Sequence, residues 1–303
     1  MTRITNTDKH VFTCASIGLL ASQALSTDQD AQIIGNTSKG LFIKTSGKWL
    51  VFLAFEQFKG PLTITLERFD PVLQLVASGK TVHITPNSIF IPDPGVTIIL
   101  EGTPVWQPPP PSAPLLDRSE RNENLVLVAK EILSKNKAGG LGSLIPAYLG
   151  LPNSQPQPPT IKGFDGSQLE LIKKYVSIEG VSHLVELLSS VLGSGPGLTP
   201  SADDFIAGLL LALNRWHIPG WTNENLGNLN HRVIEAAYNK TTTLSANLMD
   251  CATQGLANER LINALDWLVT GVAREPEVIT HLLDWGHSSG VDTFMGMAVA
   301  LKA

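Results

Sequence analysis

Short apolar runs separated by turn residues dominate the first third of the chain. Between residues 30 and 100 the runs are rich in β-branched and aromatic residues, and glycine, proline, asparagine and serine lie between them. The pattern predicts strands at 41–45, 49–55, 62–67, 81–85, 88–91 and 96–100, with TSGK (45–48) as a hairpin turn. Because no helical pattern intervenes, we expect an antiparallel barrel or sandwich. The segment 11–25 is predicted to be a helix packed against it.

The period of the apolar positions changes after a proline-rich stretch. Four consecutive prolines (108–111) form neither ladder bonds nor helix, so residues 104–116 are predicted to be a stiff linker. Helical patterns follow at 118–135, 166–176, 181–192, 201–216, 223–238, 243–256, 259–270, 275–285 and 289–302, and LPNSQPQPPT (151–160) is predicted to be a surface loop. The fold class is therefore α+β, with a β-rich domain at 1–103 and a helical domain at 117–303.

Composition narrows the set of partners. The 303 residues are 43% hydrophobic and 16% charged, with a formal net charge of −5 and no basic run. These values predict large cores and make nucleic acid and anionic membranes poor partners. No stretch of 18 apolar residues is present, and Asp8 precedes an N-terminal segment that polar residues interrupt, so we expect a cytoplasmic protein without a signal peptide. Cys14 and Cys251 have no metal-binding spacing and are predicted to be reduced, buried thiols.

The helical half contains an internal repeat with an offset of 88 residues. Each copy is S-x-x-D, three further residues, glycine and an apolar run, and the matched pairs are Ser201 and Ser289, Asp204 and Asp292, Gly208 and Gly296, and Leu213 and Leu301. The pattern predicts a capping box at each helix start, with serine as the N-cap and the aspartate at the third position. A glycine inside a helix costs about 1 kcal/mol relative to alanine, so two matched glycines indicate close approach of a backbone or a ligand.

The residues that lead into these helices predict binding of a small anion. GSGPGLTP (193–200) contains more glycine than a helix cap requires, and such loops direct backbone N–H groups toward a phosphate or carboxylate. Asp203 and Asp204 are adjacent and cannot both serve one cap. Three further polar groups are candidates for the same kind of contact: WGHSSG (285–290), with His287, Ser288 and Ser289; a third helix start at 240–255, with Thr241, Thr242, Thr243 and Ser245; and a loop at 33–40, with Asn36.

Each of these features also has a purely structural interpretation. Capping alone accounts for Ser201 and one aspartate, ordinary serine and threonine turns account for the third start, and a simple turn is favoured for the loop of Asn36. The sequence lacks GxGxxG after a strand, GxxxxGK[ST], HExxH and GxSxG, and its histidines have no metal spacing. No cofactor is firmly implied; Mg²⁺ that bridges Asp203 or Asp204 to a bound phosphate is left open.

Three motifs in this order resemble a known bacterial family. They are G-x-G-x-G-L-T-P-S-x-D-D-F-x-x-G (193–208), T-x-L-S-x-x-L-x-x-x-x-x-x-G (242–255) and G-H-S-S-G-x-D-x-x-x-G (286–296). The family, formerly of unknown function and tied to purine degradation, is associated with the third subunit of an oxamate carbamoyltransferase of allantoin catabolism. The resemblance extends over most of the chain. Ala202 departs from it, because the family usually has glycine there.

The resemblance implies that oxalurate and phosphate give oxamate and carbamoyl phosphate in a complex of several subunits. A homo-oligomer is also left open. Such a transfer requires orientation and charge neutralisation more than a redox cofactor. The candidate catalytic residues are Asp203, Asp204, His287 (as proton donor) and Asp292; the candidate substrate-binding residues are Gly195, Gly197, Thr199, Ser201, Thr242, Ser245, Ser288, Ser289 and Asn36.

Two alternatives compete with an enzyme subunit: a non-catalytic anion-binding partner, and a structural protein with tight helix packing only. For the enzyme we expect Asp203→Ala and Asp204→Ala to abolish turnover with little loss of stability. For the structural protein we expect no stabilisation by phosphate, carbamoyl phosphate, oxamate or oxalurate.

Overall fold

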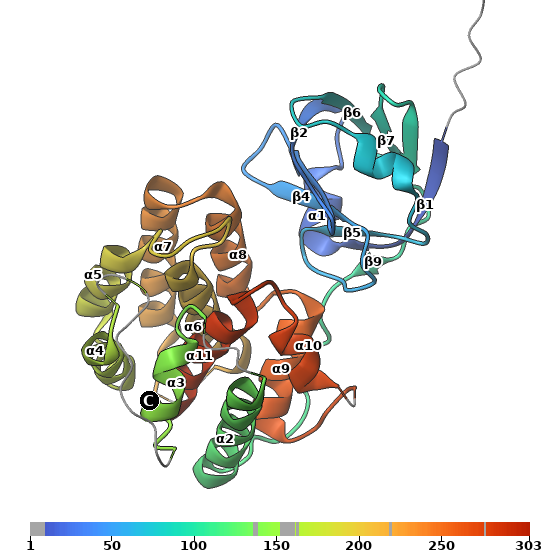
Figure 1. Ribbon diagram of the computed structural model, residues 1–303. Helices are drawn as coiled ribbons and strands as arrows, with labels where there is room; N and C mark the ends of the chain where they lie inside the picture. The colour runs from blue at the N-terminus through green and yellow to red at the C-terminus, as the bar shows by residue number, and fades with distance from the viewer. Residues whose placement is uncertain (1–9, 136–138, 152–160, 162–163, 218–219, 276) are drawn as a thin grey trace, which may run out of the picture. The chain divides into compact units, whose positions relative to one another are not determined.

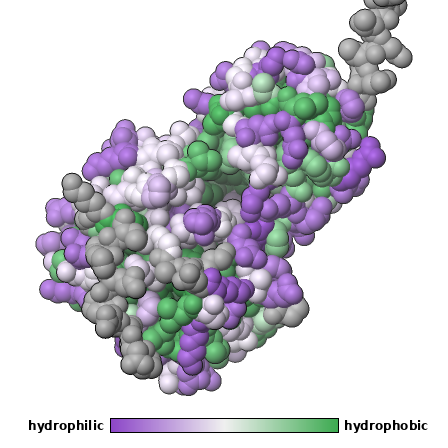
Figure 2. All heavy atoms as spheres, viewed as in Figure 1, coloured by the Kyte–Doolittle hydropathy of each residue, from purple (hydrophilic) through white to green (hydrophobic). Residues whose placement is uncertain are grey.

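The computed structural model describes residues 10–135, 139–151, 161, 164–217, 220–275 and 277–303. The chain forms two compact units, Met1–Pro108 and Pro109–Ala303, each with its own hydrophobic core. Figure 2 shows that hydrophilic residues cover much of the visible surface of both units and that hydrophobic patches interrupt them. Among the described residues, no helix is both long enough and apolar enough to cross a bilayer.

The first unit is an eight-stranded closed barrel with a short ninth strand (Figure 1). Its strands pair in the order β5-β4-β3-β2-β6-β7-β8-β1, and a β5–β1 pairing closes the ring, while β9 pairs with β1. The bounds are β1 His10–Gly18, β2 Gln29–Thr37, β3 Gly40–Lys44, β4 Leu50–Ala54, β5 Thr63–Leu66, β6 Thr81–Thr85, β7 Ser88–Ile91, β8 Val96–Ile99 and β9 Val105–Trp106. A 3₁₀ turn, η1 (Pro71–Leu75), follows β5. The α+β class, the six strands and the hairpin at 45–48 are confirmed.

Three expectations for this unit are wrong, and one of them, the loop at 33–40, is in part strand β2 (Gln29–Thr37). The barrel is mixed, because β1 pairs in parallel with β8 and β4 pairs in parallel with β5, and such non-local pairings leave no local signal. Residues 11–25 are not one helix: β1 comes first, and only α1 (Leu19–Ala24) is helical. Phe12 and Cys14 are buried while Val11 and Thr13 are exposed, which is the two-residue period of a strand with one buried face.

The second unit is helical (Figure 1). Its elements are α2 Arg118–Ser134, η2 Gly142–Leu144, α3 Ile145–Tyr148, α4 Gly166–Ser177, α5 Val181–Val191, α6 Ser201–Trp216, α7 Asn223–Lys240, α8 Thr243–Thr253, α9 Glu259–Thr270, α10 Val278–Leu283 and α11 Ser289–Lys302. All nine predicted helices are present, although α10 is shorter than 275–285, and η2 and α3 were not predicted. Residues 152–160 of the predicted surface loop lie outside the described residues. Cys14 and Cys251 are buried thiols that form no disulfide, as predicted.

Helices α6 and α11 form the centre of this unit. Their side chains are apolar on nearly all sides and almost completely buried, as expected for helices inside a core. A Cβ added at Gly208 would lie 2.0 Å from the carbonyl oxygen of Thr293, and one added at Gly296 would lie 1.9 Å from that of Phe205. The predicted close approach at the matched glycines is therefore an approach of backbone to backbone. It also sets the starts of the two helices side by side.

Candidate functional site

The starts of α6, α8 and α11 meet, and side chains of the loop before α6 connect them. The Thr199 hydroxyl donates to Oδ2 of Asp204 at 3.1 Å and lies 3.3 Å from the Ser289 hydroxyl at the start of α11. The Thr242 hydroxyl, at the start of α8, donates to the Leu198 carbonyl oxygen at 2.9 Å and accepts from the Ser245 N–H at 3.1 Å. The structure thus brings together the three helix starts that the sequence analysis selected.

The Asp203 side chain connects the loop before α6 to the start of α8 through hydrogen bonds. This side chain is 1% exposed. Oδ1 accepts the Gly193 N–H at 2.7 Å, and Oδ2 accepts the Thr241 hydroxyl. Burial raises the pKa of this carboxyl, while the bonds from Gly193, Thr241 and Ser245 oppose the rise. These contacts are those of a buried structural link, and removing the carboxyl would leave several donors without a partner.

Asp204, in the first turn of α6, lies near Thr199 of the preceding loop and Ser289 at the start of α11. Its pKa is raised to about 8, mainly by burial and also by the nearby carboxyls of Asp292 and Asp203, while the hydroxyls of Ser289 and Thr199 oppose the rise. At neutral pH most Asp204 side chains therefore carry a proton. A neutral carboxyl can donate a hydrogen bond and does not repel an anion near the helix start.

Asp292 is the matching residue of α11 and is completely buried. Its Oδ1 accepts the Leu141 N–H at 2.6 Å, and the backbone of Gly140 passes so close that a Cβ there would lie 2.3 Å from Oδ1. Burial raises its pKa to about 6, and the hydroxyls of Ser201 and Ser288 oppose the rise. Oδ2 has no hydrogen-bond partner that meets standard geometry among the described residues.

The two predicted capping boxes are wrong. Pro200 is the N-cap of α6 and Ser288 is the N-cap of α11, and neither side chain makes a cap hydrogen bond. Ser201 and Ser289 are instead the first helical residues. Ser201 interacts with Asp292 and Ser289 with Asp204, so each serine of the repeat interacts with the aspartate of the other copy.

This exchange explains the repeat better than capping does. Gly208 contacts Thr293, and Gly296 contacts Phe205, which occupies the corresponding position in the other copy. Serine, aspartate and glycine thus form reciprocal contacts between α6 and α11. Local capping rules could not predict this, because they consider one helix at a time.

The glycine-rich loop has the backbone freedom expected of an anion cradle. Gly193, Gly195 and Gly197 have φ values of 75°, 119° and 100°, which side-chain-bearing residues rarely adopt. Gly195 and Gly197 are exposed, and in the described part of the chain their N–H groups and that of Leu198 form no hydrogen bond. These groups are therefore free to contact a ligand from solvent.

Two of the predicted site residues are placed differently. His287 is exposed on the turn before α11, and no hydrogen bond joins it to the three aspartates. Asn36 belongs to the other unit and lies in β2, not on a loop. Its amide donates to the carbonyl oxygens of Leu73, Gln74 and Val76 at 3.4, 3.0 and 2.8 Å, which is a structural role in the barrel. Within the described ranges, no group of three or more histidine, cysteine or acidic side chains is arranged to hold a metal ion.

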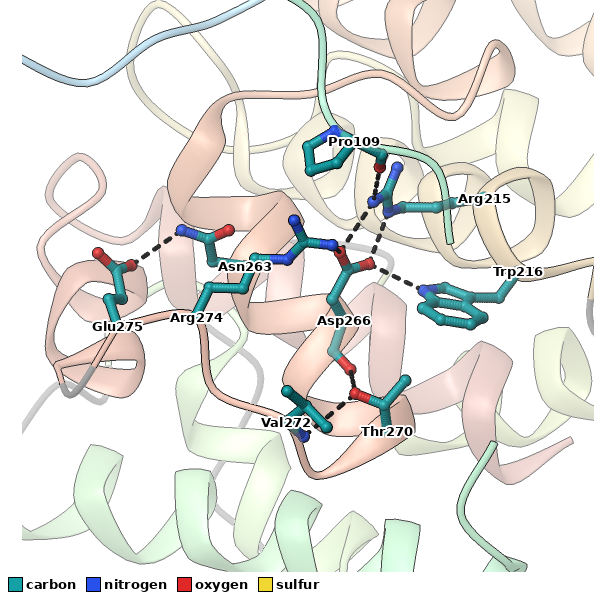
Figure 3. Close-up of polar contacts among 9 residues, drawn as sticks. All are labelled: Pro109, Arg215, Trp216, Asn263, Asp266, Thr270, Val272, Arg274 and Glu275. Carbon is teal, nitrogen blue, oxygen red and sulfur yellow. Dashed lines mark hydrogen bonds and ion pairs between the residues drawn. The ribbon is translucent and has the colours of Figure 1, made fainter. Parts of the chain in front are cut away.

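A second buried polar cluster was not predicted (Figure 3). Asp266 of α9 accepts Arg215 Nε at 2.6 Å and Nη2 at 2.8 Å, Trp216 Nε1 at 3.0 Å, and lies 3.3 Å from Arg274 Nη2. Arg215 also donates to the Pro109 carbonyl oxygen at 2.8 Å. Arg215 and Asp266 are 51 residues apart, so no local pattern could reveal the pair. Its closed geometry indicates a structural clamp.

The second unit is thus a helical bundle in which three helix starts surround buried carboxyl groups beside a glycine-rich loop with free N–H groups. Residues 191–301 match the family described as oxamate carbamoyltransferase subunit AllH. The match confirms, over these residues, the resemblance predicted from the motifs, and it contains all three helix starts. No solved structure matches the chain.

Proposed function

We propose that this chain is a subunit of a carbamoyltransferase that acts on oxalurate or oxamate and carbamoyl phosphate, and that it binds a phosphate or small carboxylate at the starts of α6, α8 and α11. The observation that carries the proposal is the position of the helix starts: they meet beside an exposed glycine-rich loop, within the segment that resembles the carbamoyltransferase subunit. The proposal places the subunit in the purine-degrading pathway that contains allantoin.

The loop amides and the helix dipoles supply the attraction for the anion. Free N–H groups at Gly195, Gly197 and Leu198 can donate to phosphate or carboxylate oxygens, and the N-termini of three helices add partial positive charge. The protonated Asp204 does not oppose this attraction at neutral pH. In carbamoyl transfer the same donors would hold the phosphate in line with the carbamoyl carbon and stabilise the developing oxyanion.

His287 is the residue best exposed for proton transfer in this proposal. It lies on the turn before α11, next to Ser288 and Ser289. As a proton donor to the leaving group it would contribute about 10²-fold or more to the rate. Because the side chain is exposed, His287→Gln is expected to leave stability unchanged and to lower kcat without a comparable change in KM.

The burial of the three aspartates favours the second candidate function, a non-catalytic subunit that binds the anion and completes a partner's site. Asp203, Asp204 and Asp292 are at most 3% exposed, so they do not touch a ligand directly and act by holding the loop and the helix starts. For the same reason the structure argues against the expectation that alanine at Asp203 or Asp204 would spare stability. Each alanine variant is expected to lose about 1–3 kcal/mol of unfolding free energy.

Calorimetry followed by reconstitution tests both candidates. The isolated chain is titrated with inorganic phosphate, carbamoyl phosphate, oxamate and oxalurate, and then assayed with its partner subunits for phosphate-dependent cleavage of oxalurate. Binding of at least one anion, together with loss of turnover in His287→Gln, supports the catalytic subunit. Binding with full turnover in His287→Gln supports the non-catalytic partner. Absence of binding for all four anions contradicts both.

A further inference from the structure

A cavity of about 350 Å³ lies at the opposite end of α11 from the helix starts, within the helical unit. Leu125 and Leu301 supply apolar walls, and Arg118, Ser119, Asn122 and Lys302 supply polar ones. The cavity lies between the first turns of α2 and the last turn of α11, which are neighbours in the fold. Helix α11 rises about 1.5 Å per residue, so the part from Asp292 to Lys302 places the cavity roughly 15 Å from Asp292. The cavity is therefore distinct from the candidate site at the helix starts.

The charged groups at this cavity are predominantly cationic. Arg118 uses one guanidinium nitrogen to donate to the Lys302 carbonyl oxygen at 2.9 Å, and within the described ranges its other N–H donors form no hydrogen bond. Among the described residues neither Arg118 nor Lys302 forms an ion pair with an acidic side chain. Burial lowers the pKa of Lys302, the charges of Lys173 and Arg118 lower it as well, and the carboxylate of Glu170 opposes this effect. The cations repel one another, and the acidic group near them, Glu170, pairs with Lys173 at 3.6 Å.

The surrounding side chains hold Lys302 in place. Its Nζ lies 3.4 Å from the Tyr148 carbonyl oxygen and 5.3 Å from the centre of the Tyr148 ring, and Lys173 Nζ lies 5.9 Å from the same ring. At the other end of the cavity, the capping box of Asp117 and Glu120 satisfies the start of α2 and orders the backbone at Arg118. Two cationic side chains therefore line the cavity beside the apolar Leu125 and Leu301.

We propose that this cavity binds a small organic anion, a carboxylate that carries an apolar group. The volume falls within the range of small-molecule sites, the apolar walls of Leu125 and Leu301 suit a hydrocarbon body, and Arg118 and Lys302 suit a carboxylate. Inorganic phosphate shares the charge but has no apolar part, so it is the weaker ligand. The site is independent of the function proposed for the helix starts.

Calorimetry on the full chain tests the site with benzoate as the probe and benzamide as its neutral counterpart. Benzoate is expected to bind at least fivefold more tightly than benzamide, because a unit charge near a cation contributes about that factor even in a watery environment. Lys302→Met keeps the apolar stem and removes the charge, and it is expected to weaken benzoate about fivefold. Arg118→Gln is a second variant with the same expectation.

A control variant makes the result specific. Lys130→Met removes an exposed charge from the same helix, α2, away from the cavity, and is expected to bind benzoate as the wild type does. The proposal is overturned if benzoate does not bind at millimolar concentration, if benzamide binds equally well, or if Lys302→Met and Lys130→Met bind benzoate with equal affinity.

Discussion

The tight contact between α6 and α11 predicts opposite effects for two glycine-to-alanine substitutions. At Gly296 an added Cβ would lie 1.9 Å from the Phe205 carbonyl oxygen, whereas ordinary contact begins at 3.4 Å. The helices would have to separate by about 1.5 Å at this point, and such overpacking costs about 1–3 kcal/mol or more. Alanine's better helix propensity returns about 1 kcal/mol. The added Cβ and the Phe205 carbonyl oxygen are both held by helix backbone and cannot rotate away from each other. We therefore expect the upper end of the overpacking cost and a net loss of about 2 kcal/mol of unfolding free energy.

Gly227 in α7 is the matched control, because a Cβ added there meets nothing within 4 Å. Gly227→Ala is expected to gain up to about 1 kcal/mol. Thermal unfolding followed by circular dichroism should therefore show a fall of roughly 4–8 °C for Gly296→Ala and a rise of roughly 2–4 °C for Gly227→Ala. A Gly296→Ala variant as stable as the wild type would refute the close helix contact.

Three further predictions address the buried polar groups. The pKa of Asp204 rises from its ordinary value of 3.8 to about 8 on folding, so the folded state binds the proton more tightly and the wild type loses stability as pH rises from about 4 to 8. In urea unfolding, the stability of Asp204→Asn relative to wild type should therefore increase over that pH range. A constant difference would contradict the raised pKa. Asp266→Asn leaves the Arg215 charge buried without its counterion and is expected to lose roughly 3 kcal/mol in the same assay, where a loss below about 1 kcal/mol would show that the clamp is dispensable. Asn36→Ala should lower the unfolding free energy by about 1–3 kcal/mol without changing anion binding in calorimetry, and the reverse outcome would assign Asn36 to a ligand site.

The sequence predicted elements well where the signal is local. The strands between 41 and 99 and the long helices such as α6 and α11 follow from apolar periodicity and turn residues. It failed at β1, because the run around Phe12 is apolar enough for a helix and only its pairing with β5 and β8 selects the strand. The parallel pairs of the barrel were missed for the same reason.

The candidate site was also predicted only in part from the sequence. The glycines Gly208 and Gly296 predicted a close approach, and the structure shows that the neighbour is backbone. The spacing of Ser201 and Asp204 indicated capping, whereas the serines interact with aspartates of the other helix. An offset of 88 residues reveals the repeat but not which copy each side chain contacts.

The most direct test of the central claim is calorimetric titration of phosphate, carbamoyl phosphate, oxamate and oxalurate into two variants at one position of the glycine-rich loop. Leu198 is 62% exposed, so Leu198→Glu and Leu198→Gln are expected to fold alike. A negative charge beside the loop amides should oppose anion binding by about 1.4 kcal/mol, a factor of ten. Leu198→Gln is expected to bind the preferred anion within about threefold of wild type, and Leu198→Glu is expected to bind it at least tenfold more weakly. Equal affinity in the two variants would contradict an anion site at these helix starts.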